Sequence, residues 1–531
     1  MYTPPRSVAH KVFEIWRSPG RFTKNPDLIA LPSGRLLLIY ADTDAHWSMH
    51  NQVLTLLASD DGGRSWFKHR EIDRADLTRG DERLVTPRLS RLNDGRLVAI
   101  CDHDDDGHFH EEQPPGNWLY WSVDQGGSWR AQHDNGIGGF EPDRVMDLPD
   151  GSLGVVSHLM RGEHQEFAEV LWVSDDGGDT WQERATVACD GYHRFCEGAL
   201  VWLHGGRRLA CVLRENHSAG IPSFVTFSDD CGHNWSAPQM LPCAIHRPYA
   251  KQLADGRVLV TGRHVNGGLG SYAWVGDLEA EVGTYRIGGP RRKFCAGLER
   301  AALVIENRLE HECRYTLLPP ESSFSEVDFE AELRVEASSG SADVAFMSIS
   351  RLGVLVTVTP DGIRMQRGRH RVQCAADMRQ WRRLRLHHRR GWLRVLLDGE
   401  AVFHRSIYRE EWPASDFHGG DPLRRTQFGQ YGDSGRSYWR RLAYRLNNPT
   451  LADHNWSWAA ADGIWPDQYQ RDRLIQLHGN HPAQQPMPDH GYSSWIQRED
   501  GRVFLVDYTN CGDVPDTSHL VGVYLEPEDL A

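Results

Sequence analysis

The sequence lacks long apolar runs and any excess of positive charge. No segment approaches the roughly 18 consecutive apolar residues that a membrane-spanning helix requires. Acidic residues outnumber basic ones, 73 against 59, which gives a formal net charge of −14. This balance argues against nucleic-acid partners and against binding to anionic membranes. We therefore expect any anionic ligand to bind in a local basic pocket.

Closely spaced cysteine pairs are also missing. The ten cysteines form no CxxC motif and no dense framework, so we expect reduced and mostly buried thiols. Residues 1–20 contain no apolar core of the signal-peptide type, and we expect a cytoplasmic location. The acidic, histidine-rich stretch 102–110 has no recognised metal-ligand spacing, so we expect a solvated loop, no metal and no cofactor.

Glycine, tryptophan and histidine are abundant instead. The 531 residues include 51 glycines, 19 tryptophans and 27 histidines, and 40% of the chain is hydrophobic. This composition is typical of a folded protein with many short strands and tight turns, and the length allows several domains or one large β unit with an addition.

One octet, S-x-D-x-G-x-x-W, occurs four times. Such a segment predicts a hairpin tip in which aspartate caps its own turn, glycine takes positive φ and tryptophan packs the turn on its neighbour. The first serines are spaced by 63, 52 and 54 residues. The four octets begin at Ser59, Ser122, Ser174 and Ser228.

A second repeat alternates with the first. Six apolar segments share a glycine in a predicted hairpin turn, five of them spaced by 61, 56, 55 and 50 residues, before a gap of 245. About 190 residues are therefore inserted between the fifth and sixth units. The turn glycines are Gly34, Gly95, Gly151, Gly206, Gly256 and Gly501.

Six units of about 55 residues predict an all-β, six-bladed β-propeller. Together, the two repeats resemble the sialidase (neuraminidase) superfamily, whose Asp-box (BNR) repeats have this form. The resemblance covers residues 1–290 and 485–531. It implies a glycoside hydrolase, although this fold carries several chemistries.

The insertion has a strand pattern of its own. Val327–Val335 alternates apolar and polar residues, and Asp398 and Gly399 mark a hairpin. The segment resembles a concanavalin/laminin-G-like jelly roll. Residues 364–394 are rich in arginine and histidine, and we expect a solvated strand face there, with a glycan- or acid-binding face as the alternative. We predict propeller blades 1–5 over residues 1–290, the inserted β-sandwich over 291–448, and a return segment with blade 6 over 449–531.

Equivalent positions in a propeller converge at one end of the central funnel. Charged and polar residues recur at three fixed distances from the turn glycines, as a polar binding site requires. Nine residues before the glycine lie Asn25, Thr86, Pro142, Glu197, Arg247 and Tyr492. One residue earlier lie Lys24, Val85, Glu141, Cys196, His246 and Gly491, and eight residues after the glycine lie Asp42, His103, Leu159, Arg214, His264 and Thr509.

The resemblance gives three of these residues a role. Tyr492 matches the nucleophilic tyrosine of sialidases, Glu197 the glutamate that takes its proton, and Arg214 one of three arginines that bind the sialic acid carboxylate. A phenol with a pKa near 10 needs a neighbouring base to act as a nucleophile. The alternative is structural: Glu197 paired with Arg214 for folding, and Tyr492 packed on Trp495.

Other positions depart from the family pattern. Lys24 stands where the first arginine is expected, and lysine cannot supply a bidentate fork. Arg263 and Arg247 are both candidates for the third arginine. The acid/base aspartate falls near His50, with Asp44 and His46 as neighbouring candidates. His103 and His264 are candidate substrate-binding residues at the same rim.

These observations favour an exo-acting, retaining hydrolase of a terminal acidic sugar: a sialic acid, a related ulosonate or a uronate. A β-propeller uronate lyase using histidine, tyrosine and arginine is the first alternative. A non-catalytic glycan-binding protein is the second. The expected partner is a glycan, and the inserted domain allows oligomer formation.

Overall fold

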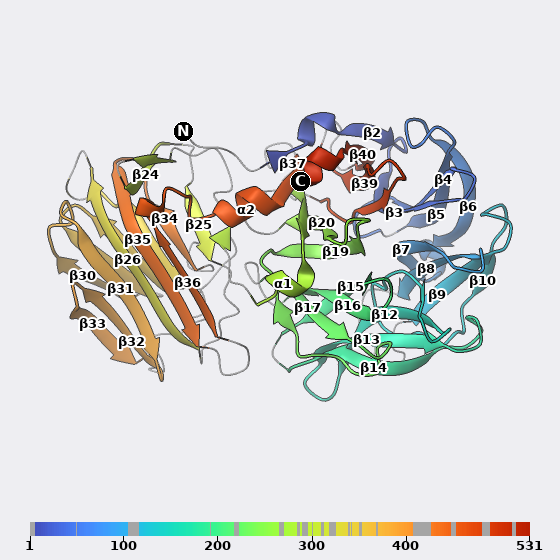
Figure 1. Cartoon of the computed structure of the whole chain (residues 1–531), viewed down its shortest axis with the longest axis horizontal. Helices are drawn as coiled ribbons and strands as arrows, with labels where there is room; N and C mark the ends of the chain where they lie inside the picture. Colours follow the sequence, from blue (N-terminus) through green and yellow to red (C-terminus); the bar gives the residue numbers. More distant parts are fainter. Residues whose placement is uncertain are drawn as a thin grey trace.

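The structure is a computed structural model. It describes residues 6–48, 50–104, 116–191, 193–216, 222–264, 270–283, 287–288, 296–299, 301–309, 313–317, 325–337, 340, 342–349, 353–367, 370–406, 426–447, 453–479, 489–511 and 517–531. The chain is nearly all β, as predicted, with repeated four-stranded antiparallel sheets consistent with a β-propeller (Figure 1).

Four such sheets follow one another along the first half of the chain. In all four, the strands lie side by side in simple chain order. The first comprises β3 (Phe22–Ala30), β4 (Leu36–Thr43), β5 (Asn51–Ser59) and β6 (Phe67–Asp76). The second comprises β7 (Arg83–Arg91), β8 (Leu97–Asp104), β9 (Gly116–Ser122) and β10 (Arg130–Gln132). The third comprises β11 (Met146–Asp147), β12 (Leu153–Arg161), β13 (Glu166–Ser174) and β14 (Gln182–Ala188). The fourth comprises β15 (Phe195–Leu203), β16 (Arg208–Glu215), β17 (Phe224–Ser228) and β18 (Gln239–Met240).

Two further sheets combine strands from both ends of the chain. In one, β1 lies parallel to β37, with Arg6 opposite Ile475, and in the other β2 is antiparallel to β40. The first has the order β1 (Arg6–Ser7), β37 (Leu474–Gly479), β21 (Gly270–Gly276), β20 (Val258–His264), β19 (Ile245–Gln252). The second has the order β2 (Phe13–Trp16), β40 (His519–Leu525), β39 (Val503–Thr509), β38 (Ser494–Gln497).

Buried carboxylates tie the first strands of neighbouring sheets together. Asp27 on β3 accepts hydrogen bonds from the backbone of Leu89 on β7, at 2.8 Å, and from the hydroxyl of Ser494 on β38, at 2.5 Å. Asp143 accepts one from the backbone of Leu200 on β15, also at 2.8 Å. These strands therefore lie side by side although they are far apart in the sequence.

Two larger sheets lie between β21 and β37 in the chain and form a separate part of the molecule, on the left of Figure 1. The short helices α1 (Leu278–Glu281) and α2 (Gln468–Arg473) lie between them and the smaller sheets. The seven-stranded sheet comprises β22 (Ile287–Gly288), β25 (Arg314–Leu317), β34 (Gln427–Gln430), β27 (Ala345–Ile349), β28 (Val354–Thr359), β29 (Gly362–Arg367) and β30 (His370–Ala375). The eight-stranded sheet comprises β23 (Ala296–Glu299), β24 (Ala302–Glu306), β35 (Arg436–Asn447), β26 (Glu326–Glu336), β31 (Arg382–Arg389), β32 (Trp392–Leu397) and β33 (Glu400–Ser406), with β36 (His454–Ala459) paired to β35.

The core of this part follows the alternation seen in the sequence. Along β26 every second side chain is buried, from Val327 to Val335, as the pattern predicted. Phe329 packs edge-on against Tyr444, and Tyr315 stacks on Phe428 with ring centroids 5.0 Å apart. Burial of apolar side chains between the two sheets stabilises the pair.

The four octets form turns of one geometry. In the first, the Asp61 carboxylate accepts hydrogen bonds from the backbone of Arg64 and Ser65, and Gly63 has φ of +99°. The indole of Trp66 donates to the Gly63 carbonyl at 3.0 Å and stacks on Phe504. The predicted capping, positive φ and tryptophan packing are confirmed, and the octet aspartates have a structural role.

The six turn glycines of the second repeat all adopt left-handed φ, between +84° and +91°. Their amides close the turns, as in the bond from Gly34 to the Leu31 carbonyl at 2.9 Å. No helix within the described ranges is long and apolar enough to cross a membrane. Within the described ranges no cysteine forms a disulfide bond, and Cys101, Cys196 and Cys243 are among the buried ones.

Candidate active site

The first strands of the small sheets share a kink at their beginning. Asn25, Thr86, Glu197 and Arg247, which stand nine residues before their turn glycines, have φ between +49° and +54°. Each kink coincides with a register shift in the pairing with the next strand. Such bulges re-aim side chains and are costly for non-glycine residues, so they are typical of functional sites.

At this end of the strands, Tyr492 meets Glu197. The phenolic Oη of Tyr492, just before β38, donates a hydrogen bond to Oε1 of Glu197 on β15, at 3.2 Å. Glu197 is buried and Tyr492 is half-buried. A tyrosine and a glutamate 295 residues apart therefore form one pair.

Three arginines surround this pair. Arg214 on β16 donates from Nη1 to the same Oε1 of Glu197, at 2.5 Å. The guanidinium carbons of Arg247 and Arg263 lie 5.4 Å and 5.7 Å from the centre of the Tyr492 ring. Both candidates for the third arginine therefore lie beside the phenol, and with Arg214 they gather three cations there.

Other groups hold two of these arginines in place. Arg247 donates to the backbone carbonyls of Glu141 and Pro142, at 2.9 Å and 3.1 Å. Arg263 donates to the Asp489 carboxylate at 2.9 Å and to the His490 carbonyl at 2.9 Å. Fixed guanidinium groups are suited to binding a planar anion such as a carboxylate.

A second carboxyl group lies against Glu197. Burial, together with the neighbouring Glu197 carboxylate, raises the pKa of Glu141 well above its usual value. Burial opposes ionisation of Glu197 as well, but Arg214, Glu141 and Arg247 lower its pKa well below the usual range. Of the two carboxyl groups, Glu197 therefore ionises more readily, and Glu141 keeps its proton to higher pH.

In the sequence, Pro142 stands nine residues before its turn glycine, as Glu197 does, and Glu141 stands one residue earlier. Glu141 has φ of +47°, and Pro142 follows it. The proline ring fixes φ at negative values, so the kink moves one residue toward the N-terminus. The same shift occurs beside Tyr492, where Gly491 has φ of +90°.

The tyrosine is held as a neutral phenol. Burial is the largest influence, and with the charges of Glu141 and Glu197 it raises the pKa of Tyr492 well above its usual value. Arg214 and Arg263 act in the opposite direction. The hydrogen bond to the ionised Glu197 gives the phenolic proton a destination when the oxygen forms a bond.

Asp489 connects Lys24 and His46 with the arginine cluster, and no sequence motif pointed to this residue. The buried ammonium of Lys24 donates to the His46 carbonyl at 2.5 Å, and burial lowers the pKa of Lys24 to about 8. His46 contacts the Asp489 carboxylate through Nδ1. Burial opposes ionisation of Asp489, but the bond from His46 and the charge of Arg263 lower its pKa to about 2.

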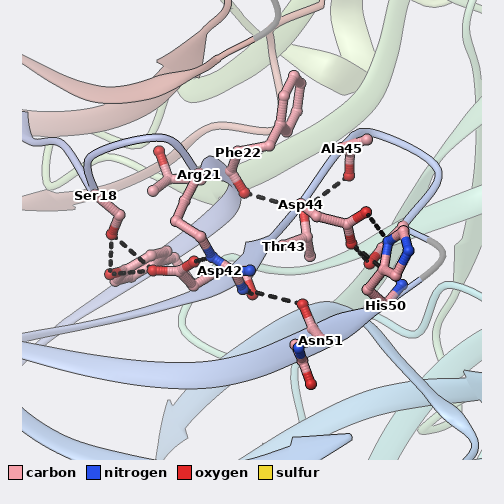
Figure 2. A network of polar contacts seen from close by, with 12 residues as sticks. Ser18, Arg21, Phe22, Asp42, Thr43, Asp44, Ala45, His50 and Asn51 are labelled. Carbon is pink, nitrogen blue, oxygen red and sulfur yellow. Dashed lines mark hydrogen bonds and ion pairs between the residues drawn. The ribbon is translucent and has the colours of Figure 1, made fainter. Parts of the chain in front are cut away.

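Asp44 and His50 form a separate pair beyond the end of β4 (Figure 2). Nδ1 of His50 lies 2.9 Å from Oδ2 of Asp44, and Ser48 donates to the other oxygen of the same carboxylate. Figure 2 also shows Arg21 bridging Asp42 and the backbone of Asn51, which fixes the base of this loop. Asp44, His46 and His50 thus share one short loop.

His103 contacts an acidic side chain at the end of the second sheet. Its Nδ1 lies 2.6 Å from a carboxylate oxygen of Glu82, and its ring lies against Trp118, with centroids 4.6 Å apart. His264 pairs with Ile245 through its backbone, and its side chain lies outside the described part. In the segment 102–110, only the first residues are described. The buried Asp102 among them accepts from the backbone of Glu141 at 3.0 Å, and burial raises its pKa to about 6.

No protein-family model and no curated protein matches the chain. Among solved structures, a protein of unknown function from Dyadobacter fermentans has a TM-score of 0.44 and 18% identity over 59% of this chain and 95% of its own. The Trypanosoma rangeli sialidase with 2,3-difluorosialic acid has 0.36 and 10%, over 81% and 92%. An α-L-arabinanase from Penicillium chrysogenum has 0.39 and 16%, over 56% and 92%. With TM-scores below 0.5, these similarities carry no argument about activity.

Proposed function

We propose that the protein is a retaining, exo-acting glycoside hydrolase of the sialidase type, acting on a terminal acidic sugar. One observation carries this: the Tyr492 hydroxyl lies 3.2 Å from Glu197, with three arginines around the pair. The proposal includes the architecture, with the six small sheets as propeller blades and the two large sheets as an inserted jelly roll.

In this mechanism the oxygen of Tyr492 attacks the anomeric carbon. The bond to the leaving oxygen breaks, and the phenolic proton passes to Glu197. A neutral phenol suits an anionic sugar, because a carboxylate nucleophile would bring one negative charge against another. Water then hydrolyses the glycosyl–tyrosine, so that the product keeps the starting anomeric configuration.

The arginines supply the binding energy for the acidic group. Arg214, Arg247 and Arg263 are the cations nearest the phenol, and a carboxylate accepting their N–H groups would hold the anomeric carbon over Tyr492. Lys24, linked to them through Asp489, adds positive charge where the family has an arginine.

The leaving oxygen requires a proton, and we assign this step to the loop that carries Asp44, His46 and His50. His46 contacts Asp489, which also binds Arg263, so it is the candidate joined to the arginine cluster. His103 and His264 are assigned to the outer part of the sugar site. No step of this mechanism uses a metal or a cofactor.

The test uses 4-methylumbelliferyl glycosides of sialic acid and of glucuronic acid. We expect release of the fluorophore from one of them, and a product whose first anomer, observed by NMR, has the configuration of the substrate. Tyr492→Phe should lower kcat at least about 10²-fold, since it removes the nucleophile. Tyr524→Phe is the control, because that hydroxyl binds the Gly62 carbonyl at an outer turn. Inversion, or full activity of Tyr492→Phe, would overturn the proposal.

A uronate lyase is the second candidate, because a phenol beside three arginines also suits proton abstraction next to a carboxylate. Its product is unsaturated and absorbs in the ultraviolet, whereas a hydrolase product does not. Binding of acidic glycans without turnover would favour a glycan-binding protein instead.

A further inference from the structure

A second pocket lies at the opposite ends of the strands that begin at the candidate active site. Its volume is about 660 Å³. Glu197 and Arg247 stand near the beginnings of β15 and β19, whereas the pocket is lined by residues near the ends of these strands. Each of the six small sheets contributes to the wall, for example through Ala30, Arg91, Asp147, Trp202, Lys251 and Gln497.

A layer of buried charged and aromatic groups separates this pocket from Glu197 and Tyr492. The guanidinium of Arg144 lies 4.3 Å from the centre of the Tyr249 ring, and that of Arg88 lies 5.3 Å from it. Arg144 also donates to the carbonyls of Leu200 and Ala250, at 3.1 Å each. The two sites are therefore distinct, and a ligand in one does not touch the other.

The wall of the pocket is cationic. Arg91, Arg144 and Lys251 line it, against one carboxylate, that of Asp147. The Asp147 carboxylate accepts a hydrogen bond from the backbone of Asn93 at 3.0 Å. Arg144 is paired with the buried Asp143 carboxylate at 3.6 Å, whereas neither Arg91 nor Lys251 forms an ion pair within the described ranges. Positive charge thus remains for a ligand, in a chain whose net charge is −14.

Lys251 is the central cation of this wall. Its ammonium lies 4.9 Å from the Tyr249 ring centre and 5.9 Å from that of Trp495, and its hydrogen bond to the Trp495 carbonyl is long, at 3.4 Å. Lys251 is half-buried, and the neighbouring rings replace part of the water around it, which strengthens its attraction for an anion.

Buried donors without acceptors lie at the same place. Arg144 is 8% exposed, and its Nη1 has no hydrogen-bond partner among the described residues. The same holds for the indole nitrogen of Trp495, which is 1% exposed. Both donor atoms are closed off from solvent, so the positive charge that a ligand in the pocket can reach comes from Arg91 and Lys251.

Apolar and aromatic groups complete the pocket. Ile29, Val145, Met146 and Ile496 line it together with Trp202. A small anion with an apolar or aromatic ring matches this combination, because the ring buries apolar surface while its charged group meets Lys251 and Arg91. We propose that this pocket binds a small organic carboxylate, independently of the glycan site.

The experiment is a calorimetric titration of the full chain with benzoate, and with benzamide as the uncharged molecule of the same shape. We expect saturable binding of benzoate and at least tenfold weaker binding of benzamide. Lys251→Met should weaken benzoate binding at least tenfold, whereas Lys68→Met, on the outer strand β6, should leave it unchanged. Absence of saturable benzoate binding at millimolar concentration overturns the proposal.

A second variant does not depend on the buried charges. Ala30 is exposed at the end of β3 and lines the pocket, so Ala30→Trp should fill it and abolish binding while Lys251 stays intact. Tyr492→Phe and Arg214→Met should bind benzoate as the unchanged protein does. Loss of binding in Arg214→Met, or full binding in folded Ala30→Trp, would place benzoate elsewhere and overturn the proposal.

Discussion

Glu141, which is half-buried, and Glu197, which is buried, are neighbouring carboxyl groups whose pKa values are shifted in opposite directions. Burial and the neighbouring Glu197 oppose ionisation of Glu141, while Arg214 and Arg247 favour the ionised form of Glu197. In the proposed mechanism this pair determines the protonation state of Glu197, which is the base for Tyr492. The proton on Glu141 also limits the negative charge that an acidic sugar meets.

The alkaline limb of activity is expected to depend on Glu141. When pH rises through its raised pKa, a second carboxylate appears beside Glu197 and repels both the substrate and the developing phenolate. Glu141→Gln keeps a neutral side chain and removes this ionisation. We expect the alkaline limb of kcat/KM to move to higher pH in the variant, measured with the fluorogenic glycoside.

Glu279→Gln is the matched control, since Glu279 pairs with Arg208 at the edge of the fourth sheet. Its pH profile should equal that of the unchanged protein. If the alkaline limb of Glu141→Gln lies at the same pH as that of the unchanged protein, a group other than Glu141 titrates there.

Substrate binding is expected to weaken above pH 8 because of Lys24. Burial lowers the pKa of this ammonium to about 8, so it loses its charge at a pH where an exposed lysine keeps it. KM for the acidic sugar should therefore rise several-fold between pH 7 and 9, with kcat changing less. Lys24→Met should have a high KM at pH 7 and little further rise. A KM that rises with pH as steeply in Lys24→Met would exclude Lys24 as the cause.

The sequence was sufficient for the turns of the small sheets. Glycine must occupy left-handed turns, so the six glycines appear at a fixed place in each unit, and the structure gives all of them positive φ. The octets are equally local, because Asp61 and its equivalents bond to backbone within four residues. Signals that depend on short stretches of chain can be read without a structure.

Only part of the candidate site could be predicted from the sequence. Fixed offsets identified Glu197 and Arg247, and the structure gives both the same backbone kink. The offset of nine residues pointed to Pro142. The kink is at Glu141, one residue earlier, because the proline ring does not allow a positive φ. Asp489 precedes the last repeat and belongs to no motif, and only folding brings it to Arg263 and His46. The pKa shifts depend on burial, which cannot be read from the spacing of residues in the sequence.

Asp489 should contribute to stability at neutral pH. Its pKa is about 2 in the folded chain against 3.8 for an unperturbed aspartate, so its ionised form stabilises the folded state by about 2 kcal/mol above pH 4. This contribution is lost as pH falls from about 4 to about 2. Asp489→Asn should lower Tm at pH 7 by a few degrees, measured by circular dichroism. Near pH 2 the Tm of the variant and the Tm of the unchanged protein should differ less.

The control for this measurement is Asp60→Asn, since Asp60 pairs with Arg35 at an exposed turn. Exposed ion pairs contribute little, so its Tm should change by less than about 1 °C. A Tm at pH 7 that is equal in Asp489→Asn and the unchanged protein would contradict the stabilising role of Asp489.

Gly491 should be essential, for a steric reason that separates it from turn glycines such as Gly34. It has φ of +90°, and a Cβ added there would lie 2.7 Å from the backbone nitrogen and Cα of Arg263. Gly34 has a similar φ of +85° but open space around it. Gly34→Ala therefore costs only the backbone strain, about 1 kcal/mol, whereas Gly491→Ala must also displace a strand that carries an arginine of the site. We expect Gly491→Ala to lose at least about 2 kcal/mol in urea denaturation and most of its activity, because Tyr492 and Arg263 move apart. Equal stability losses in the two variants would mean that strain alone, and not the contact with Arg263, determines the effect.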